Sequence, residues 1–100
     1  MEEKHIEQNL RKAVEKTGGR AIKLTSPGTA GMPDRLLLLP GGRVIFIELK
    51  APGGHLRPIQ KHRHNQLQQL GFTVHTINNK HQIESLIHEI QTTQLPKIRN

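Results

Sequence analysis

Cysteine, tryptophan and tyrosine are all absent from this sequence of 100 residues, and phenylalanine occurs only twice. Without cysteine, the chain has no disulfide framework, no thiolate metal site and no thiol nucleophile. With so few aromatic rings, stacking on exposed side chains is not a means of gripping unpaired bases, which argues against a single-strand-binding module. The charged start MEEKHIEQNL and the lack of a long apolar run predict a cytoplasmic protein with no membrane partner.

Acidic residues are also few. Eight Asp and Glu stand against fifteen Lys and Arg, which gives a formal net charge of +7. A basic balance of this size favours a polyanionic partner, most simply nucleic acid. The length is that of one domain, which we place at residues 1–91, with residues 92–100 as a flexible tail.

Hydrophobic periodicity predicts an α/β fold with the order α-β-β-β-α-β-α, in which a mixed sheet is flanked by helices and a closing helix follows. The two strands in the middle form a hairpin, and the second of them, apolar on both faces, is expected to be central. Within the second helix, Ile59, Leu67 and Leu70 are expected to form the buried stripe. The predicted helices are 3–17, 56–71 and 80–90, and the predicted strands are 20–25, 34–40, 43–51 and 72–77.

Two acidic residues, Asp34 and Glu48, interrupt the apolar stretch GMPDRLLLLPGGRVIFIELK. Glu48 and Lys50 share one face of their strand, because successive side chains alternate. If Pro40, Gly41 and Gly42 form a three-residue loop, Asp34 lies directly across from Glu48; a two-residue loop sets it opposite Leu49 instead. Two facing carboxylates are costly unless a divalent cation binds between them, and oxygen ligands without thiols suit Mg²⁺ or Mn²⁺.

The segment SPGTAGMPDRLLLLPGGRVIFIELKAPGGHLRPIQ resembles the virus-type replication-repair nuclease (VRR-NUC) family of the PD-(D/E)xK superfamily, and the likeness runs from about residue 3 to residue 90. The resemblance implies a restriction-endonuclease-like core. It also implies that Asp34 and Glu48 bind the metal and that Lys50 serves the attacking water.

Two further roles follow from the resemblance alone. The family places a metal-binding Glu on the first helix, which is Glu3 by its position before Ile6, with Glu7 one turn later as the alternative. It places a Gln on the helix after the third strand, which matches Gln60. This side chain is expected to orient the water or a phosphate.

DNA contacts are predicted in two regions. The resemblance implies that the loop SPGTAGMP lies beside the scissile phosphate, where its glycines allow close backbone approach; Ser26, Gly28, Gly31 and the following Arg35 are expected to contact DNA. The loop lacks the Gly-Lys-Ser/Thr ending of a nucleotide-binding loop, so no nucleotide cofactor is expected. A basic stripe along the second helix is expected to follow the DNA, with an ordinary solvated face as the alternative. Its members are His55, Arg57, Lys61, Arg63 and His64. Zinc is disfavoured, because His62 and His64 diverge on a helix.

The resulting hypothesis is a metal-dependent, structure-selective DNA endonuclease, encoded by a virus, prophage or host. The resemblance points to a homodimer that resolves four-way (Holliday) junctions. Flaps, nicks and duplex DNA are alternative substrates. A noncatalytic DNA-binding protein that retains the nuclease fold is the alternative from another class, and the Asp34, Glu48 and Lys50 set argues against it.

Overall fold

The computed structural model describes residues 3–92 and contains the predicted order of helices and strands. The helices are α1 (Glu3–Lys16), α2 (Pro58–Gln69) and α3 (Lys80–Thr92), and the strands are β1 (Arg20–Lys23), β2 (Arg35–Leu39), β3 (Arg43–Leu49) and β4 (Thr73–Ile77). A single 3₁₀ turn, η1 (Pro40–Gly42), joins β2 to β3. The predicted tail lies outside the described residues except for Thr92, which ends α3.

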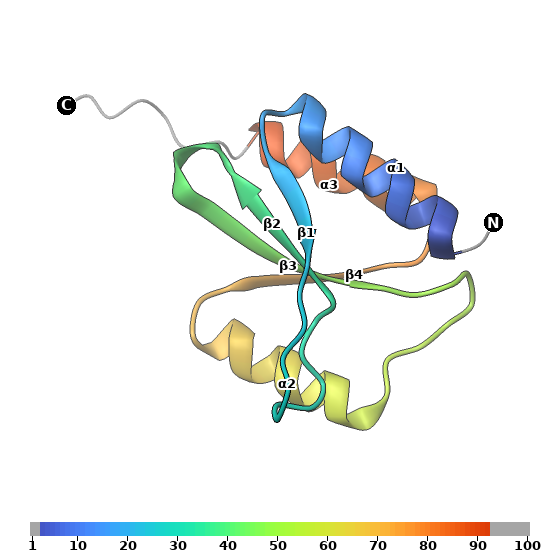
Figure 1. The fold of residues 1–100 in the computed structure, drawn as a ribbon, viewed down its shortest axis with the longest axis vertical. Helices are drawn as coiled ribbons and strands as arrows, with labels where there is room; N and C mark the ends of the chain where they lie inside the picture. The colour runs from blue at the N-terminus through green and yellow to red at the C-terminus, as the bar shows by residue number, and fades with distance from the viewer. Residues whose placement is uncertain (1–2, 93–100) are drawn as a thin grey trace.

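The four strands form one sheet in the order β1-β2-β3-β4. The first three strands run antiparallel, and β4 pairs with β3 in parallel. Helices α1 and α3 cover one face of this sheet and α2 lies against the other, so the molecule has three layers (Figure 1). The predicted α/β fold with a mixed sheet is therefore confirmed.

Strand β3 has apolar side chains on both faces because both faces are covered. Ile45, Ile47 and Leu49 point into the main core, where they join Leu37 of β2 and the apolar stripes of α1 and α3. The α1 stripe is Ile6, Leu10 and Val14, and the α3 stripe is Ile83, Leu86 and Ile90. The alternate side chains of β3, which include Glu48, therefore face α2.

The buried face of α2 differs from the predicted one. Ile59 is 38% exposed and Leu70 is 74% exposed, so only Leu67 of the expected apolar stripe is buried. The buried residues of α2 are Gln60, His64 and Leu67, which follow the i, i+4, i+7 spacing of one helical face. This helix turns polar side chains inward because it covers the end of β3 that carries Glu48.

Among residues 3–92, no helix is long and apolar enough to cross a membrane.

Candidate active site

The β2–β3 hairpin adopts the register that faces Asp34 towards Glu48. Leu39 pairs with Arg43 across the three-residue turn, in which Gly41 and Gly42 take positive φ angles of 81° and 80°. Such angles suit glycine, which has no Cβ to clash. The pairing extends to Arg35 with Ile47, so the next position along sets Asp34 opposite Glu48. The alternative two-residue loop is thereby excluded.

The Asp34 carboxylate is fixed at the end of the hairpin. Its Oδ1 accepts a hydrogen bond of 3.1 Å from the backbone N–H of Leu49, the residue after Glu48. Its backbone carbonyl accepts a bond of 2.9 Å from the N–H of Leu24, which continues the pairing towards β1. Both carboxylates therefore belong to one rigid corner of the sheet.

The Glu48 carboxylate is buried, with the residue only 5% exposed. Its Oε2 accepts a hydrogen bond of 3.0 Å from Gln60 Nε2 and lies 3.6 Å from Lys50 Nζ. Its Oε1 is also buried, yet it has no hydrogen-bond partner among the described residues. A buried carboxylate oxygen without a donor is costly, so this atom is ready to bind a cation or an ordered water.

Burial raises the pKa of Glu48 above its usual value, and the nearby charge of Asp34 raises it further. Lys50 and the hydrogen bond from Gln60 act in the opposite direction, but they do not overcome these two causes. The strand thus holds the carboxylate at a cost in stability. A divalent cation between the two carboxylates would remove that cost.

Gln60 is held in place by the start of α2. Its Oε1 accepts a hydrogen bond of 2.8 Å from the backbone N–H of Arg57, the residue before the first helical position. Because the amide oxygen is engaged in this way, the Nε2 group is turned towards Glu48. Gln60 therefore links the first turn of α2 to the buried carboxylate.

The acidic residues of α1 lie in two different environments. Glu3 lines the same cavity of about 320 Å³ as Asp34. Glu7 instead pairs with Arg35, whose Nε lies 4.0 Å from Glu7 Oε2 and whose Nη1 lies 3.6 Å from Asp34 Oδ2. Of the two alternatives for the helix acid, Glu3 is the one that lines the cavity containing Asp34, which Lys23 and Arg35 also line.

The oxygen donors fit a hard divalent ion bound by few protein ligands. Across residues 3–92, no three Asp, Glu or His side chains approach closely enough to form a complete metal cage. Mg²⁺ does not need one, because it keeps several waters and takes substrate oxygens as ligands. Asp34 and the partnerless Oε1 of Glu48 are the donor set that matches this preference.

The loop residues predicted to contact DNA differ in their surroundings. The loop runs from β1 to β2, and Ser26 and Gly28 are at least partly exposed within it. Gly31 has a φ of 84°, and a Cβ there would lie 2.4 Å from the backbone oxygen of Ile59. The close approach that this glycine allows is therefore to α2 rather than to a phosphate.

The predicted basic stripe is only partly exposed. His55, Arg57 and Lys61 are open to solvent. Arg63 donates from Nε to the carbonyl of Ala30 at 2.9 Å and from Nη1 to Gln66, so it ties the loop to α2. His64 does not belong to a surface stripe, because it is 5% exposed.

His64 was predicted as a surface DNA contact, but it is buried beside the site instead. Among residues 3–92, no group hydrogen-bonds its buried Nε2, and burial together with the charge of Lys50 lowers the pKa of the ring, which favours the neutral form. The i, i+4 spacing from Gln60 is the signal that places both side chains on one face of α2. Arg35 was also expected at the DNA, but its side chain is 11% exposed and turned towards Glu7 and Asp34.

The raised pKa of Glu48 predicts how stability changes with pH. As pH rises, the unfolded chain releases this proton first, near 4.5, so the metal-free protein loses stability until the folded-state pKa is passed. We expect Glu48→Gln to raise the melting temperature at pH 7 in EDTA, with the gain disappearing below about pH 4.5. Differential scanning calorimetry tests this, with Glu15→Gln on the exposed face of α1 as the control. An equal gain at pH 4 and pH 7 would contradict it.

Comparisons with known proteins agree with this geometry. A model of the VRR-NUC domain family matches residues 1–81. A protein named "Putative nuclease p44", from Acyrthosiphon pisum secondary endosymbiont phage 1, is 45% identical over 78 residues, covering 78% of this chain and 84% of the relative. A solved structure described as a VRR_NUC domain superimposes with a TM-score of 0.81 at 29% identity, covering 86% of this chain and 94% of the other. The chain therefore belongs to the VRR-NUC family of nuclease domains.

Proposed function

We propose that this nuclease is a metal-dependent, structure-selective DNA endonuclease that acts as a homodimer, with four-way junctions as its substrate. The observation that carries the catalytic part is the buried carboxylate of Glu48, which faces Asp34 and whose Oε1 accepts no hydrogen bond from the part of the chain that the structure describes. Asp34 and Glu48 would hold Mg²⁺ or Mn²⁺, with Glu3 of α1 in the lining of the cavity that contains Asp34. When bound, such an ion supplies charge that offsets the negative charge growing on the phosphate and makes a nearby water more acidic.

The remaining residues of the site act on the water, the phosphate and the Glu48 carboxylate. Lys50 keeps an ammonium 3.6 Å from Glu48 Oε2, where it holds the attacking water and stabilises developing charge. Gln60 fixes the orientation of the Glu48 carboxylate through its bond of 3.0 Å. The side chains of His55, Arg57 and Lys61 are exposed and are available for phosphates.

A noncatalytic DNA-binding role is less consistent with this arrangement. Phosphates repel carboxylates, so a binding module gains nothing from two of them at one corner of its sheet. The raised pKa of Glu48 is a further cost that a simple scaffold would not keep. The arrangement is explained by chemistry at a phosphate and not by binding alone.

The substrate and the assembly are argued from size and symmetry. One chain offers one site, which suffices to nick a single strand. Cutting two opposed strands of a branched DNA needs two sites in a fixed relation, and a twofold dimer provides them. A four-way junction has the same twofold symmetry, so a dimer and this substrate match each other.

We expect a homodimer in solution that cleaves four-way DNA more efficiently than linear duplex. The test is cleavage of labelled four-way, flap, nicked and duplex DNA with Mg²⁺ and with Mn²⁺, together with sedimentation equilibrium at micromolar protein. Preference for flaps or nicks would redirect the substrate assignment. A strict monomer that does not prefer branched DNA would overturn junction resolution and leave the nuclease activity standing.

A further inference from the structure

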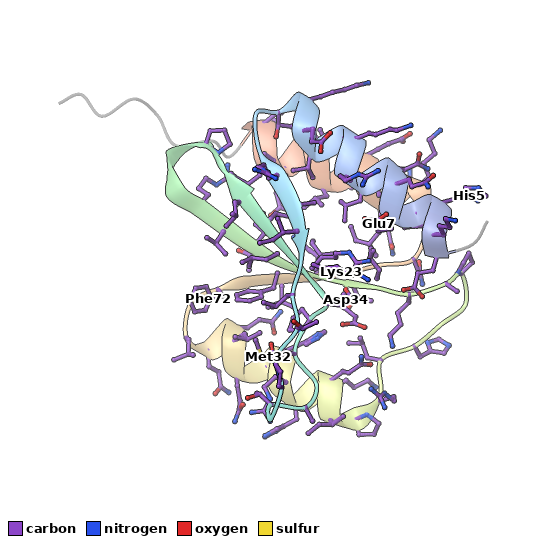
Figure 2. The ribbon with its side chains drawn as sticks, viewed as in Figure 1. His5, Glu7, Lys23, Met32, Asp34 and Phe72 are labelled. Atoms are coloured by element: carbon purple, nitrogen blue, oxygen red, sulfur yellow. The ribbon has the colours of Figure 1, made fainter. Side chains whose placement is uncertain are left out.

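A groove between α1 and β1 leads away from the site. Arg35 is the one residue of its described lining that was assigned to DNA from the sequence. The volume of the groove is about 600 Å³, and Lys4, Arg11 and Lys23 contribute its outer cations. Figure 2 shows Glu7, Lys23 and Asp34 near one another where α1 passes the ends of β1 and β2. We call Lys4, Arg11 and Lys23 the groove cations.

The groove cations are available to a ligand. All three are exposed, and none of them has a carboxylate within salt-bridge distance among residues 3–92. The other cation of the groove, Arg35, is occupied by Glu7 and Asp34. Since Glu7 is paired in this way, Glu3 is the one carboxylate among the described residues of the groove that is left to oppose the three groove cations.

The groove is continuous with the site. Glu3, Lys23 and Arg35 line both this groove and the smaller cavity that contains Asp34. Lys23 pairs with Arg35 across the sheet, so it stands one residue from the level of Asp34. Carboxylates therefore gather at one end, where the scissile phosphate is proposed, and unpaired cations continue from there along α1.

The spacing of the groove cations suits a nucleic-acid backbone. Lys4 and Arg11 are seven residues apart on one flank of α1, a rise of roughly 10 Å. One strand of duplex DNA carries a phosphate about every 3.4 Å along the helix axis, so roughly three phosphates pass over this length. The side chains thus form a line of positive charge and not a single anion pocket.

We propose, on the basis of the proposed nuclease function, that this groove binds the phosphates of the DNA strand next to the scissile bond through Lys4, Arg11 and Lys23. The strand enters along α1, crosses the end of β1 at Lys23 and reaches the carboxylates at Asp34. Helix α2 and its exposed cations contact the DNA on the other side of the site. The DNA is then held from both helical layers.

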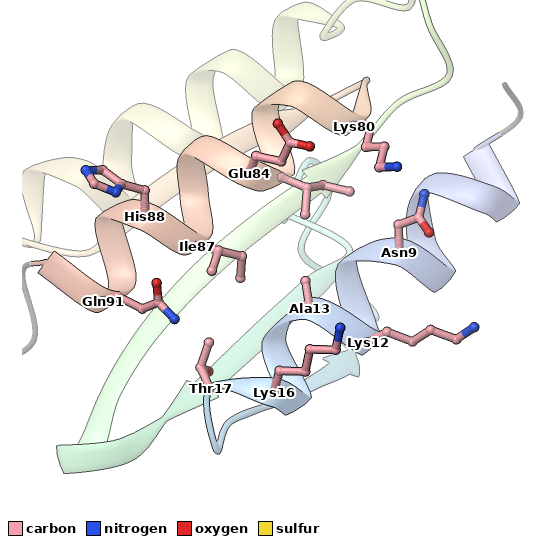
Figure 3. A pocket seen from close by; sticks show the side chains of 11 residues that line it. Asn9, Lys12, Ala13, Lys16, Thr17, Lys80, Glu84, Ile87, His88 and Gln91 are labelled. Carbon is pink, nitrogen blue, oxygen red and sulfur yellow. The ribbon is translucent and has the colours of Figure 1, made fainter.

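The other flank of α1 provides a matched control. Lys12, Lys16 and Lys80 line a separate groove of about 510 Å³ between α1 and α3, which does not include Asp34 (Figure 3). Arg11 and Lys12 are neighbours in sequence but are 100° apart around the helix, so they face different grooves. Replacing either set of three cations by glutamine removes the same charge.

The test compares two triple variants, Lys4→Gln/Arg11→Gln/Lys23→Gln and Lys12→Gln/Lys16→Gln/Lys80→Gln. Binding to labelled DNA is measured by fluorescence anisotropy in EDTA at several salt concentrations, and cleavage is measured with Mg²⁺. The groove variant is expected to bind at least about tenfold more weakly, with the slope of log K against log salt reduced by about 0.9 for each lost contact. Its KM is expected to rise while kcat at saturating DNA stays within about threefold of the wild type; the control variant keeps its affinity within about threefold.

Equal weakening in both variants would reduce the effect to net charge and overturn the proposal. Wild-type affinity in the groove variant would overturn it as well. These two results test only the groove. The proposed nuclease chemistry is tested separately by cleavage with Asp34→Asn, measured in parallel. Melting temperatures establish that both triple variants are folded, and the single pair Lys23→Gln and Lys12→Gln repeats the comparison with one charge each.

Discussion

We expect Asp34→Asn to reduce metal-dependent DNA cleavage by about 10³-fold or more while the protein stays folded. The asparagine keeps the shape of the side chain and can still accept the bond from the Leu49 N–H, so the hairpin corner is preserved. It removes the charge that a divalent ion requires from this side of the site. Glu48→Gln is expected to lose activity to a similar extent, even though it is expected to raise stability.

Single-turnover cleavage with excess enzyme measures this loss, and calorimetric titration with Mn²⁺ measures whether metal binding falls with it. Glu15→Gln removes a carboxylate of α1 that is exposed to solvent, and serves as the control for a change in charge. Near-normal turnover in either Asp34→Asn or Glu48→Gln would show that the assignment of the metal ligands is wrong.

The second large effect is expected at Lys50. We expect Lys50→Arg to lower kcat by about 10²-fold or more, close to the effect of Lys50→Ala. The side chain is 20% exposed and its ammonium lies 3.6 Å from Glu48 Oε2, so there is little room for the broader guanidinium. A guanidinium also stays protonated and delivers its charge in a fixed plane, unlike a compact ammonium beside a water.

Rapid-quench cleavage at saturating DNA isolates the chemical step, and binding of DNA and Mn²⁺ is expected to be retained in both Lys50 variants. Lys12→Arg, on the far flank of α1, controls for the exchange of lysine for arginine as such. Full activity in Lys50→Arg would reduce Lys50 to a general positive charge near the site.

Much of the fold could be predicted because its signals are local. The stripe of Ile6, Leu10 and Val14 defines α1, and the apolar run of β3 marks a strand covered on both faces. The facing of Asp34 and Glu48 could be predicted only conditionally. It depends on the length of a turn, and the sequence allowed two lengths.

The inner face of α2 could not be predicted from hydrophobicity. Gln60 and His64 are buried because they cover a polar site, while Ile59 and Leu70 remain exposed. A rule that buries apolar residues first places this helix with the wrong side inward. The engagement of Arg35 with Glu7 and Asp34 was missed for a related reason, since it needs α1 and β2 to be positioned first.

The turn at Pro40–Gly42 has a consequence for which changes the domain can accept. The five residues of β2 separate it from Asp34, roughly 20 Å along the strand. The turn is exposed, so its residue types are open to substitution within the limits that positive φ sets. The length of the turn, by contrast, cannot change without altering the pairing of β2 with β3. One residue added or removed there would slide β2 against β3 and turn Asp34 to the opposite face of the sheet. Natural variation in this domain should therefore include point changes in the turn but few insertions or deletions, although the turn touches neither metal nor DNA in the proposed complex.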